Sequence, residues 1–299
     1  MAAAPYHRPE TLEAALAILR DVTAPPMILA GGTDLYPTQA AAEAWMRPAS
    51  ARPVLDISAL PGLDGIEDRG EHHRIGARVT WAALRDATHL PACFDGLRAC
   101  TRQVGGAQVQ NRATLLGNLC NASPAADGVP PLLALGAEVE LASAARGRRR
   151  LPLAAFILGN RRTALAPDEL ALAVLVPRHG PGARGGFLKL GARSHLVISI
   201  AMVAGVIEVL EGRVMAARLA AGACSSVAQR LLAAEAAIVG RAAADPSALA
   251  AAILPRHLGP LSPIDDVRAT AAYRREAALV LLRRLVAGLA APDRTRAAA

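Results

Sequence analysis

The segment from Asn111 to Asp127, NRATLLGNLCNASPAAD, constrains the fold of this chain more than any other part of the sequence. It consists mainly of small, hydroxyl and amide residues. A core strand would instead carry β-branched or aromatic side chains, and an exposed loop would carry more charge. Glycine lets a backbone approach a ligand closely, and Thr, Asn and backbone N–H groups can bind oxygens that carry negative charge. The segment therefore predicts either a ligand-binding loop or a polar turn that leads into a helix.

A second segment favours the ligand-binding alternative. Met27–Ala30 is a short apolar run typical of a buried strand, and Gly31, Gly32, Thr33 and Asp34 follow it. A strand, a glycine pair and a residue that can cap a helix are the usual parts of a phosphate cradle. The segment is not a Rossmann fingerprint, which needs a third glycine, and it is not a P-loop, which needs a lysine after the glycines. An ordinary turn is the alternative.

In their order and spacing, AGGTDL and TLLGNLCNASPAAD resemble the paired flavin-binding motifs of the FAD-carrying medium subunit of molybdenum hydroxylases. That family includes xanthine dehydrogenase and carbon monoxide dehydrogenase. The resemblance covers nearly the whole chain and continues through Phe187–Arg193, Ala221–Cys224 and Asp266–Arg274. It implies an α+β chain, with a two-subdomain FAD-binding fold of the PCMH/vanillyl-alcohol-oxidase type and a small α+β C-terminal domain whose antiparallel sheet has helices on one face.

We expect the FAD-binding subdomains at residues 1–57 and 58–176 and the C-terminal domain at residues 187–291. The Gly- and Pro-rich segment at residues 177–186 is the expected linker.

The resemblance also implies which residues contact the cofactor. The first motif would wrap the pyrophosphate and adenosine side of FAD, and the second would line the other half. Asp127 would hold a ribityl or ribose hydroxyl, although a helix cap before Pro130 is an equal alternative. Lys189, the only lysine among 33 basic residues, would place its ammonium beside the flavin, unless its position is due to chance. The expected cofactor-binding residues are Ile28, Leu29, Ala30, Gly31, Gly32, Thr33, Asp34, Leu35, Val104, Gly105, Thr114, Gly117, Asn118, Asn121, Asp127 and Lys189.

Two departures from the family pattern affect these expectations. Leu116 precedes Gly117 where the family has a glycine pair, so one close backbone approach to the cofactor is lost or shifted. Ser194–Val197 stands where many relatives carry an acidic residue before an Ile-Ala pair, in the region that influences access of the electron acceptor. NAD is therefore not assigned as the acceptor. His195 is expected to be a surface residue, with a pH-sensitive neighbour of the flavin as the alternative.

The resemblance implies an oxidoreductase subunit that works by electron transfer and has no acid–base catalytic residue and no metal ligand. FAD would lie in this chain, a [2Fe–2S] cluster in an iron–sulfur small subunit, and molybdopterin in a large subunit. Electrons would pass from the cluster through FAD to NAD or another acceptor, in a cytoplasmic dimer of heterotrimers. Two alternatives stay open: a stand-alone FAD oxidoreductase of the same superfamily, and a flavin-free assembly subunit, which Leu116 suggests.

Composition excludes other classes of function. The net charge of +8 does not indicate nucleic-acid binding, because aromatic residues are only 3% of the chain and the arginines are scattered. The run at Arg146–Arg150 is expected to be a solvated hairpin tip, with a docking edge for an acidic partner as the alternative. Four cysteines without a CxxC pair indicate reduced thiols. The longest apolar run, Leu196–Ile207, is too short to cross a bilayer, and no signal peptide is expected.

Hydrophobic periodicity and turn residues predict the remaining elements. His72 and His73, at the edge of an expected hairpin, are expected to be exposed. Thr80 is expected to cap a helix. The predicted helices lie at residues 10–20, 81–87, 93–104, 130–135, 228–239 and 268–289, and the predicted strands at 27–30, 53–57, 63–67, 73–75, near 139, 172–176, 187–190, 197–209 and 214–220.

Overall fold

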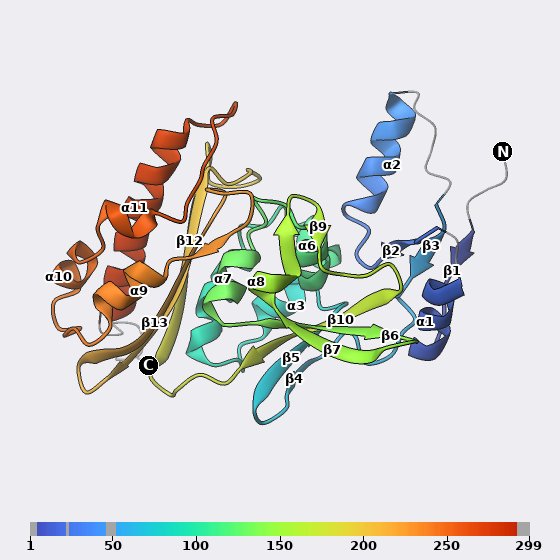
Figure 1. Ribbon diagram of the computed structural model, residues 1–299, viewed down its shortest axis with the longest axis horizontal. Coiled ribbons are helices and arrows are strands. Elements are labelled where there is room, and N and C mark those ends of the chain that lie inside the picture. Colours follow the sequence, from blue (N-terminus) through green and yellow to red (C-terminus); the bar gives the residue numbers. More distant parts are fainter. Residues whose placement is uncertain (1–4, 22–23, 46–51, 292–299) are drawn as a thin grey trace.

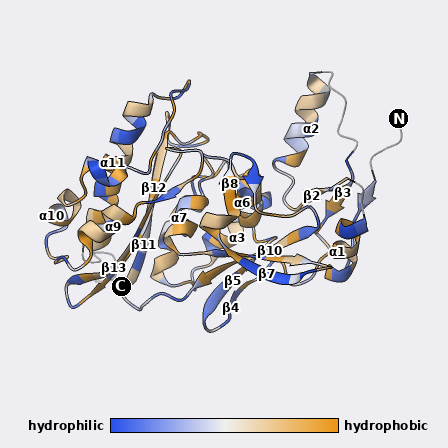
Figure 2. Cartoon of the chain, viewed as in Figure 1, coloured by the Kyte–Doolittle hydropathy of each residue, from blue (hydrophilic) through white to orange (hydrophobic). Residues whose placement is uncertain are grey.

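The computed structural model describes residues 5–21, 24–45 and 52–291. Three sheets follow one another along the long axis of the molecule, and the C-terminal sheet lies at the opposite end from the first (Figure 1). Apolar residues follow the inner strands and the helices that face them, whereas hairpin tips such as β4–β5 are hydrophilic (Figure 2). No helix within the described ranges is long and apolar enough to span a membrane.

The first sheet is parallel and has the order β1-β3-β2, as expected for a small β-α-β unit. Helix α1 (Leu12–Asp21) follows β1 and contacts β10 and β6 of the middle sheet, and its buried residues Ala15, Leu16 and Leu19 lie on one face of the helix. Helix α2 (Leu35–Ala44) follows the glycine turn and stands away from the sheet (Figure 1). The strands are β1 (Tyr6–His7), β2 (Met27–Leu29) and β3 (Val54–Asp56).

The middle sheet is antiparallel and has the order β4-β5-β10-β6-β7. Its central strand β10 (Glu169–Pro177) is buried along nearly its whole length, as the apolar sequence ELALAVLV requires. The other strands are β4 (Ile66–Asp68), β5 (His72–Gly76), β6 (Glu138–Ser143) and β7 (Gly147–Pro152). A short helix α8 (Leu153–Phe156) and the two-stranded hairpin of β8 (Ile157–Gly159) and β9 (Arg162–Thr163) follow β7.

A series of short helices lies between β5 and β6. The Thr80 hydroxyl accepts a hydrogen bond from the backbone N–H of Ala83, which confirms the predicted cap. The single helix predicted at residues 93–104 is wrong, because the chain forms a 3₁₀ turn and then a helix that ends at Thr101. The elements are α3 (Trp81–Asp86), η1 (Ala92–Phe94), α4 (Asp95–Thr101), α5 (Ala107–Arg112), α6 (Leu115–Asn121) and α7 (Val129–Ala134).

The C-terminal sheet is antiparallel and has the order β11-β12-β13-β14. Helices α9 and α11 pack on one face of it, and α7 packs on the other (Figure 1). The strands are β11 (Ala183–Leu190), β12 (Ala201–Leu210), β13 (Arg213–Gly222) and β14 (Gln229–Arg230). The helices are α9 (Leu232–Ile238), α10 (Pro246–Ala251), η2 (Pro255–Leu258) and α11 (Ala271–Ala290).

The two faces of β12 belong to two hydrophobic clusters. Met202 and Ala204 point into the cluster that also fills the middle sheet, whereas Ala201 and Val203 point into the cluster under α11. This alternation follows from the two-residue period of a strand. The core of the middle sheet therefore continues into the C-terminal sheet without a break.

Three predicted elements in the C-terminal half differ from the observed ones. Strand β12 starts at Ala201 rather than at residue 197, because Leu196 has a φ of +52° and its carbonyl accepts a hydrogen bond from Arg193 in a local turn. The helix predicted at residues 228–239 is only seven residues long, since Gln229 and Arg230 pair with β13 instead. The segment between β10 and β11 is residues 178–182, shorter than the Gly- and Pro-rich run suggested.

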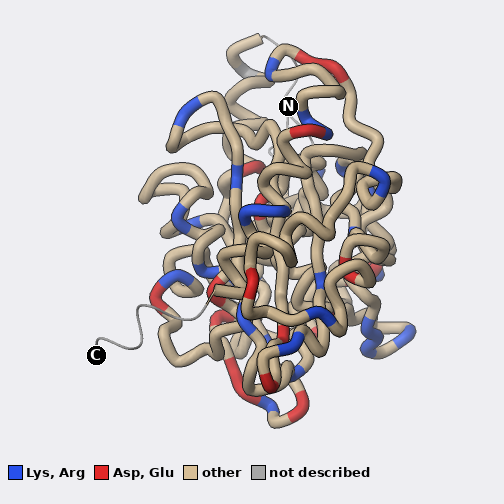
Figure 3. The backbone as a smooth tube through the Cα atoms, turned by 90° about the vertical axis from the view of Figure 1, so that its left-hand side faces the viewer, with Lys and Arg blue, Asp and Glu red and all other residues tan. Residues whose placement is uncertain are grey.

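Two surface expectations are also corrected. His73 is buried, not exposed, because its ring packs edge-on against Phe94 at a centroid distance of 5.1 Å. Of the arginine run only Arg146 lies in the turn, whereas Arg148 and Arg149 are exposed on β7 and form ion pairs with Glu140 and Glu169. In Figure 3, basic and acidic residues are interspersed along the tube, so the excess of arginine does not gather into one basic stripe in that view.

Candidate functional site

The glycine turn after β2 forms one wall of the candidate site. Gly32 has a φ of +74°, a conformation that L side chains rarely adopt. A Cβ atom at Gly31 would lie 2.1 Å from the carbonyl oxygen of Arg112, so the turn touches the end of α5 at a distance that only glycine permits. The backbone N–H groups from Gly31 to Leu35 donate to no acceptor among the described residues. The turn is therefore a row of available donors at the start of α2.

Helix α6 forms the opposite wall. Its N-cap is Thr114, whose hydroxyl accepts a hydrogen bond of 3.1 Å from the backbone N–H of Gly117. Asn118 and Asn121 are one helical turn apart and lie on the same side of the helix. The Oδ1 atom of Asn118 is buried and has no hydrogen-bond partner within the described part of the chain. The segment therefore forms a polar turn that starts a helix, as one alternative predicted, and this helix lines a cavity.

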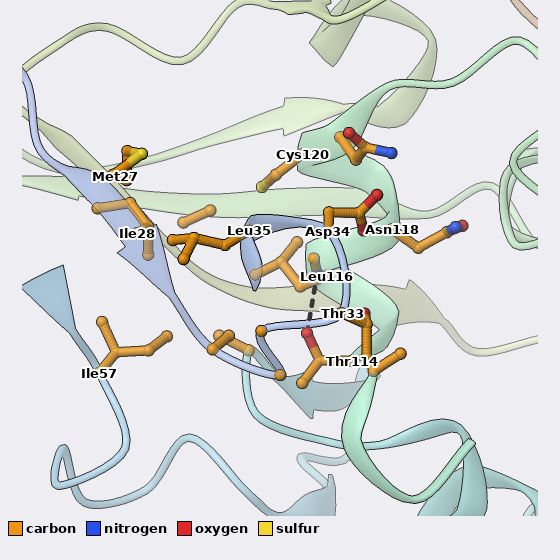
Figure 4. A pocket seen from close by; sticks show the side chains of 18 of the residues that line it. Met27, Ile28, Thr33, Asp34, Leu35, Ile57, Thr114, Leu116, Asn118 and Cys120 are labelled. Atoms are coloured by element: carbon orange, nitrogen blue, oxygen red, sulfur yellow. Dashed lines mark hydrogen bonds between the residues drawn. The ribbon is translucent and has the colours of Figure 1, made fainter. Parts of the chain in front are cut away.

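Between these walls lies a cavity of about 780 Å³ (Figure 4). It is lined by twelve of the sixteen residues expected from the sequence. Those twelve are Ile28, Ala30, Gly31, Gly32, Thr33, Asp34, Leu35, Val104, Thr114, Gly117, Asn118 and Asn121. Leu29, Gly105, Asp127 and Lys189 do not line it. Leu29 is buried behind the turn, where its Cδ1 atom lies near Gly32.

Several other residues that were not predicted also line the cavity. Thr38, Gln39 and Ala42 come from α2, and helical spacing from the glycine turn would have identified them. Arg161 comes from the β8–β9 hairpin and Leu165 from the segment after it, and no local pattern links either residue to the two motifs. The remaining lining residues are Met27, Arg52, Ile57, Ala77, Trp81, Val109, Ala113, Leu116, Cys120, Leu170 and Ala171.

Asp127 and Lys189 contact each other beside the cavity. The Nζ atom of Lys189 lies 2.6 Å from Oδ2 of Asp127 and donates a 3.3 Å hydrogen bond to the carbonyl of Gln103. The Ser199 hydroxyl donates to Oδ1 of Asp127 at 2.6 Å. Burial raises the pKa of Asp127, and the Lys189 and Ser199 bonds oppose this rise. Asp127 is not the helix cap considered above, because the N-cap of α7 is Gly128.

The chemistry of the cavity is that of a binding site. Its charged lining residues are Asp34, Arg52 and Arg161, and most of the others are apolar, hydroxyl or amide residues. The Cys120 thiol stays protonated, since burial raises its pKa to about 12. The described residues contain no group of His, Cys, Asp and Glu that could hold a metal ion. The arrangement suits a long ligand with flat apolar parts and a phosphate-bearing centre.

Comparisons with known proteins agree with this geometry. Residues 2–179 match the family model described as "FAD binding domain in molybdopterin dehydrogenase". Residues 187–289 match the model described as "CO dehydrogenase flavoprotein C-terminal domain". The two matches together cover nearly the whole chain.

Individual relatives align over almost their full lengths. The chain is 32% identical to the nicotine 6-hydroxylase medium subunit of Paenarthrobacter nicotinovorans, over 94% of this chain and 95% of that protein. It is 30% identical to the carbon monoxide dehydrogenase medium chain of Afipia carboxidovorans, over 94% of each. A solved carbon monoxide dehydrogenase from Hydrogenophaga pseudoflava, which lacks the Mo-pyranopterin moiety of its cofactor, matches with a TM-score of 0.84 and 27% identity. That match covers 97% of this chain and 99% of the other.

Proposed function

Because the chain belongs to the family of FAD-binding medium subunits of molybdenum hydroxylases, we propose that its cavity holds FAD and that it passes electrons from an iron–sulfur subunit to NAD or another acceptor. The observation that carries the proposal is the cavity between the glycine turn and α6. A dinucleotide needs donors for its pyrophosphate and apolar surfaces for its two ring systems, and this cavity offers both.

The residues present fit the cofactor at its phosphates. The N–H groups of Gly31 to Leu35 have no acceptor within the described ranges, and they lie at the N-terminus of the ten-residue helix α2. A helix N-terminus with free N–H groups favours phosphate. The glycine pair keeps side chains away from that position. On the other wall, the unpartnered Oδ1 of Asn118 can accept a hydrogen bond from a ligand donor.

We propose direct contacts with FAD for the twelve expected residues that line the cavity. Gly105, Asp127 and Lys189 stay predicted contacts, with Lys189 beside the flavin and Asp127 at a ribityl or ribose hydroxyl. Lys189 binds the carbonyl of Gln103, which adjoins the lining residue Val104, so this cluster lies close to one end of the cavity. Leu29 supports the turn from behind.

FAD supplies the electron exchange when it is bound, and the chain supplies binding, orientation and electrostatics. Among the described residues, the cavity lining holds one carboxylate, Asp34, and no histidine, so these residues offer no acid–base pair for a substrate. Substrate oxidation would therefore occur in another chain. The relatives named as medium subunits and medium chains support a complex with an iron–sulfur small subunit and a molybdopterin large subunit. We propose that the complex is a cytoplasmic dimer of such heterotrimers. Within this chain, we propose domain boundaries after residues 57, 176 and 186.

The first experiment is flavin binding by the purified chain. We expect a yellow protein that retains FAD, or takes up one FAD on titration, and that binds FMN more weakly because FMN lacks the AMP half. A colourless chain that binds no FAD would overturn the proposal and favour the flavin-free assembly subunit.

The second experiment concerns partners. Purification of the tagged chain from its native cell should recover two further chains together with iron and molybdenum. A lone chain that is fully active as an oxidase would instead identify a stand-alone FAD enzyme.

A further inference from the structure

Arg161 has a backbone conformation that is unusual for its residue type. Its φ is +53°, in the left-handed region that favours glycine or asparagine. Its N–H donates a 3.0 Å hydrogen bond to the carbonyl of Ala122, which itself has a φ of +48° and ends α6. The hairpin tip is thereby tied to the end of the helix that lines the cavity. Strained residues of this kind tend to occur where a side chain must be aimed at a ligand.

The Arg161 side chain lines the cavity and is exposed at its edge. Its guanidinium has neither a hydrogen-bond nor an ion-pair partner in the part of the chain that the structure describes. The arginine of the neighbouring β7 hairpin, Arg149, differs, since Glu169 binds its guanidinium at 2.6 Å. The other cavity cation, Arg52, donates to the carbonyls of Pro25 and Pro26. Arg161 thus brings an uncompensated positive charge to a ligand cavity.

The position of Arg161 indicates which part of the ligand it meets. Ala122 directly follows α6, so Arg161 lies at the C-terminal end of that helix. Val104 lies near the N-terminal end of α6. The residue after it, Gly105, packs on Val109 of α5, and α5 leads directly into Thr114, the N-cap of α6. A seven-residue helix separates these ends by about 10 Å. If the isoalloxazine lies at the Val104 and Lys189 end, Arg161 faces the half of the dinucleotide that carries AMP.

We propose that Arg161 is a binding residue for the AMP phosphate of the dinucleotide. The inference rests on the proposed function and deepens it, because it adds a cation that neither family motif contains. A guanidinium can bind two phosphate oxygens with two parallel N–H bonds. The left-handed backbone and its bond to Ala122 hold the side chain over the cavity before the ligand arrives. Local strain is therefore offset by phosphate binding in the loaded protein.

The test combines ligand affinity with thermal stability. Arg161→Ala should weaken FAD binding about tenfold, and Arg161→Lys should recover part of the loss because it restores the charge without the planar fork. Arg161→Gly should also weaken FAD binding, yet it should raise the melting temperature of the cofactor-free chain by about 1–2 °C, since glycine relieves the positive φ. If Arg161 were merely structural, Arg161→Gly would not weaken FAD binding while it raises the melting temperature of the cofactor-free chain. Arg162→Ala is the matched control, because Arg162 is exposed and does not line the cavity.

A comparison of AMP with adenosine tests whether Arg161 binds the phosphate, because the two ligands differ only in that group. By calorimetric titration, the unsubstituted chain should bind AMP more tightly than adenosine, and Arg161→Gly should reduce this difference. Unchanged FAD affinity in Arg161→Ala, or an unchanged preference for AMP in Arg161→Gly, would overturn the inference while the proposed function stands. An unsubstituted chain that binds no FAD would overturn both.

Discussion

The ammonium of Lys189 and the carboxylate of Asp127 form a buried ion pair, with the two side chains 4% and 10% exposed. The only lysine of the chain is thus joined to the end of the segment that carries the second motif. A lone charge about 5 Å from a flavin would change the energy of the reduced form by roughly 3 kcal/mol at an effective dielectric constant near 20. The Asp127 carboxylate offsets most of that field, so Lys189 affects the flavin potential less than its charge alone implies.

Removing one member of this pair should destabilise the fold strongly. Lys189→Met leaves the Asp127 carboxylate buried with Ser199 as its remaining side-chain partner, and the expected loss is about 3–5 kcal/mol of unfolding free energy. Asp127→Asn should have a similar effect, and the double variant should recover much of the loss. Urea denaturation of the four chains measures the coupling. Arg178→Gln, which breaks an exposed pair with Asp68, is the control and should cost less than about 1 kcal/mol. Additive losses in the double variant would contradict the prediction.

The two glycines of the turn should respond differently to alanine. In Gly31→Ala the new Cβ meets the backbone of Arg112, so we expect about 1–3 kcal/mol of destabilisation and weaker FAD binding. In Gly32→Ala the Cβ meets the ring of Tyr36, which is half exposed and can rotate away. The loss of stability should therefore come mainly from the strain of the positive φ, about 1–2 kcal/mol.

Thermal melts and FAD titrations compare these variants. The control is Gly212→Ala, which has a φ of +73° with open space around it and lies far from the cavity in the β12–β13 hairpin. Normal FAD affinity in Gly31→Ala would mean that the contact between the turn and α5 does not shape the site.

Leu116 should limit the affinity for FAD. Its side chain lines the cavity beside the glycine turn (Figure 4), in a position where the resemblance described above leads us to expect glycine. Leu116→Gly should tighten FAD binding, because it removes a side chain from the cavity. It should also lower the stability of the fold, because a buried leucine side chain is lost and glycine is unfavourable in a helix. Leu115→Gly removes a buried neighbour that does not line the cavity, so it should lower stability without tightening binding. Equal FAD affinities in both variants would show that Leu116 does not narrow the site.

The parts of the site that follow from local sequence were predictable. The glycine turn needs only a strand, two glycines and a helix start, and the cap of α6 needs only Thr114 and a helical segment after it. Contacts between residues that are distant in the sequence could not be predicted in this way. Nothing near Asp127 indicates Lys189, which lies 62 residues further along the chain. His73 was misjudged for the same reason, since its burial depends on the contact of its ring with Phe94, which is distant in the sequence.

A pH-dependent contact joins the segment after β10 to its surroundings. Arg218 on β13 donates to Nδ1 of His179 at 3.0 Å, and Nε2 of His179 donates to the carbonyl of Leu135 at 3.0 Å. Burial lowers the pKa of His179 below its ordinary value of 6.5, and the charge of Arg218 adds to this effect. Because the neutral ring is favoured in the fold, the stabilisation is present above pH 6.5 and is lost as the pH falls through the lowered pKa.

His179→Gln should therefore flatten the acid side of the stability profile. Melting temperatures between about pH 5 and 8 should fall less steeply for the variant than for the unsubstituted chain. His195→Gln serves as the control, since His195 is exposed in a surface turn. Parallel profiles for the His179 variant and the unsubstituted chain would rule out this contact as a pH-sensitive element.

The continuous core has a consequence for dissecting the protein. Helix α7 precedes the segment 178–182, yet it packs on the C-terminal sheet, and Met202 of that sheet belongs to the same hydrophobic cluster as Trp81. A chain cut within residues 178–182 would expose the apolar surfaces of both pieces to water. The fragments should consequently aggregate when expressed alone and recover a native-like melt only when co-expressed. The two regions that match the family models thus share one hydrophobic core, and each should need the other in order to fold.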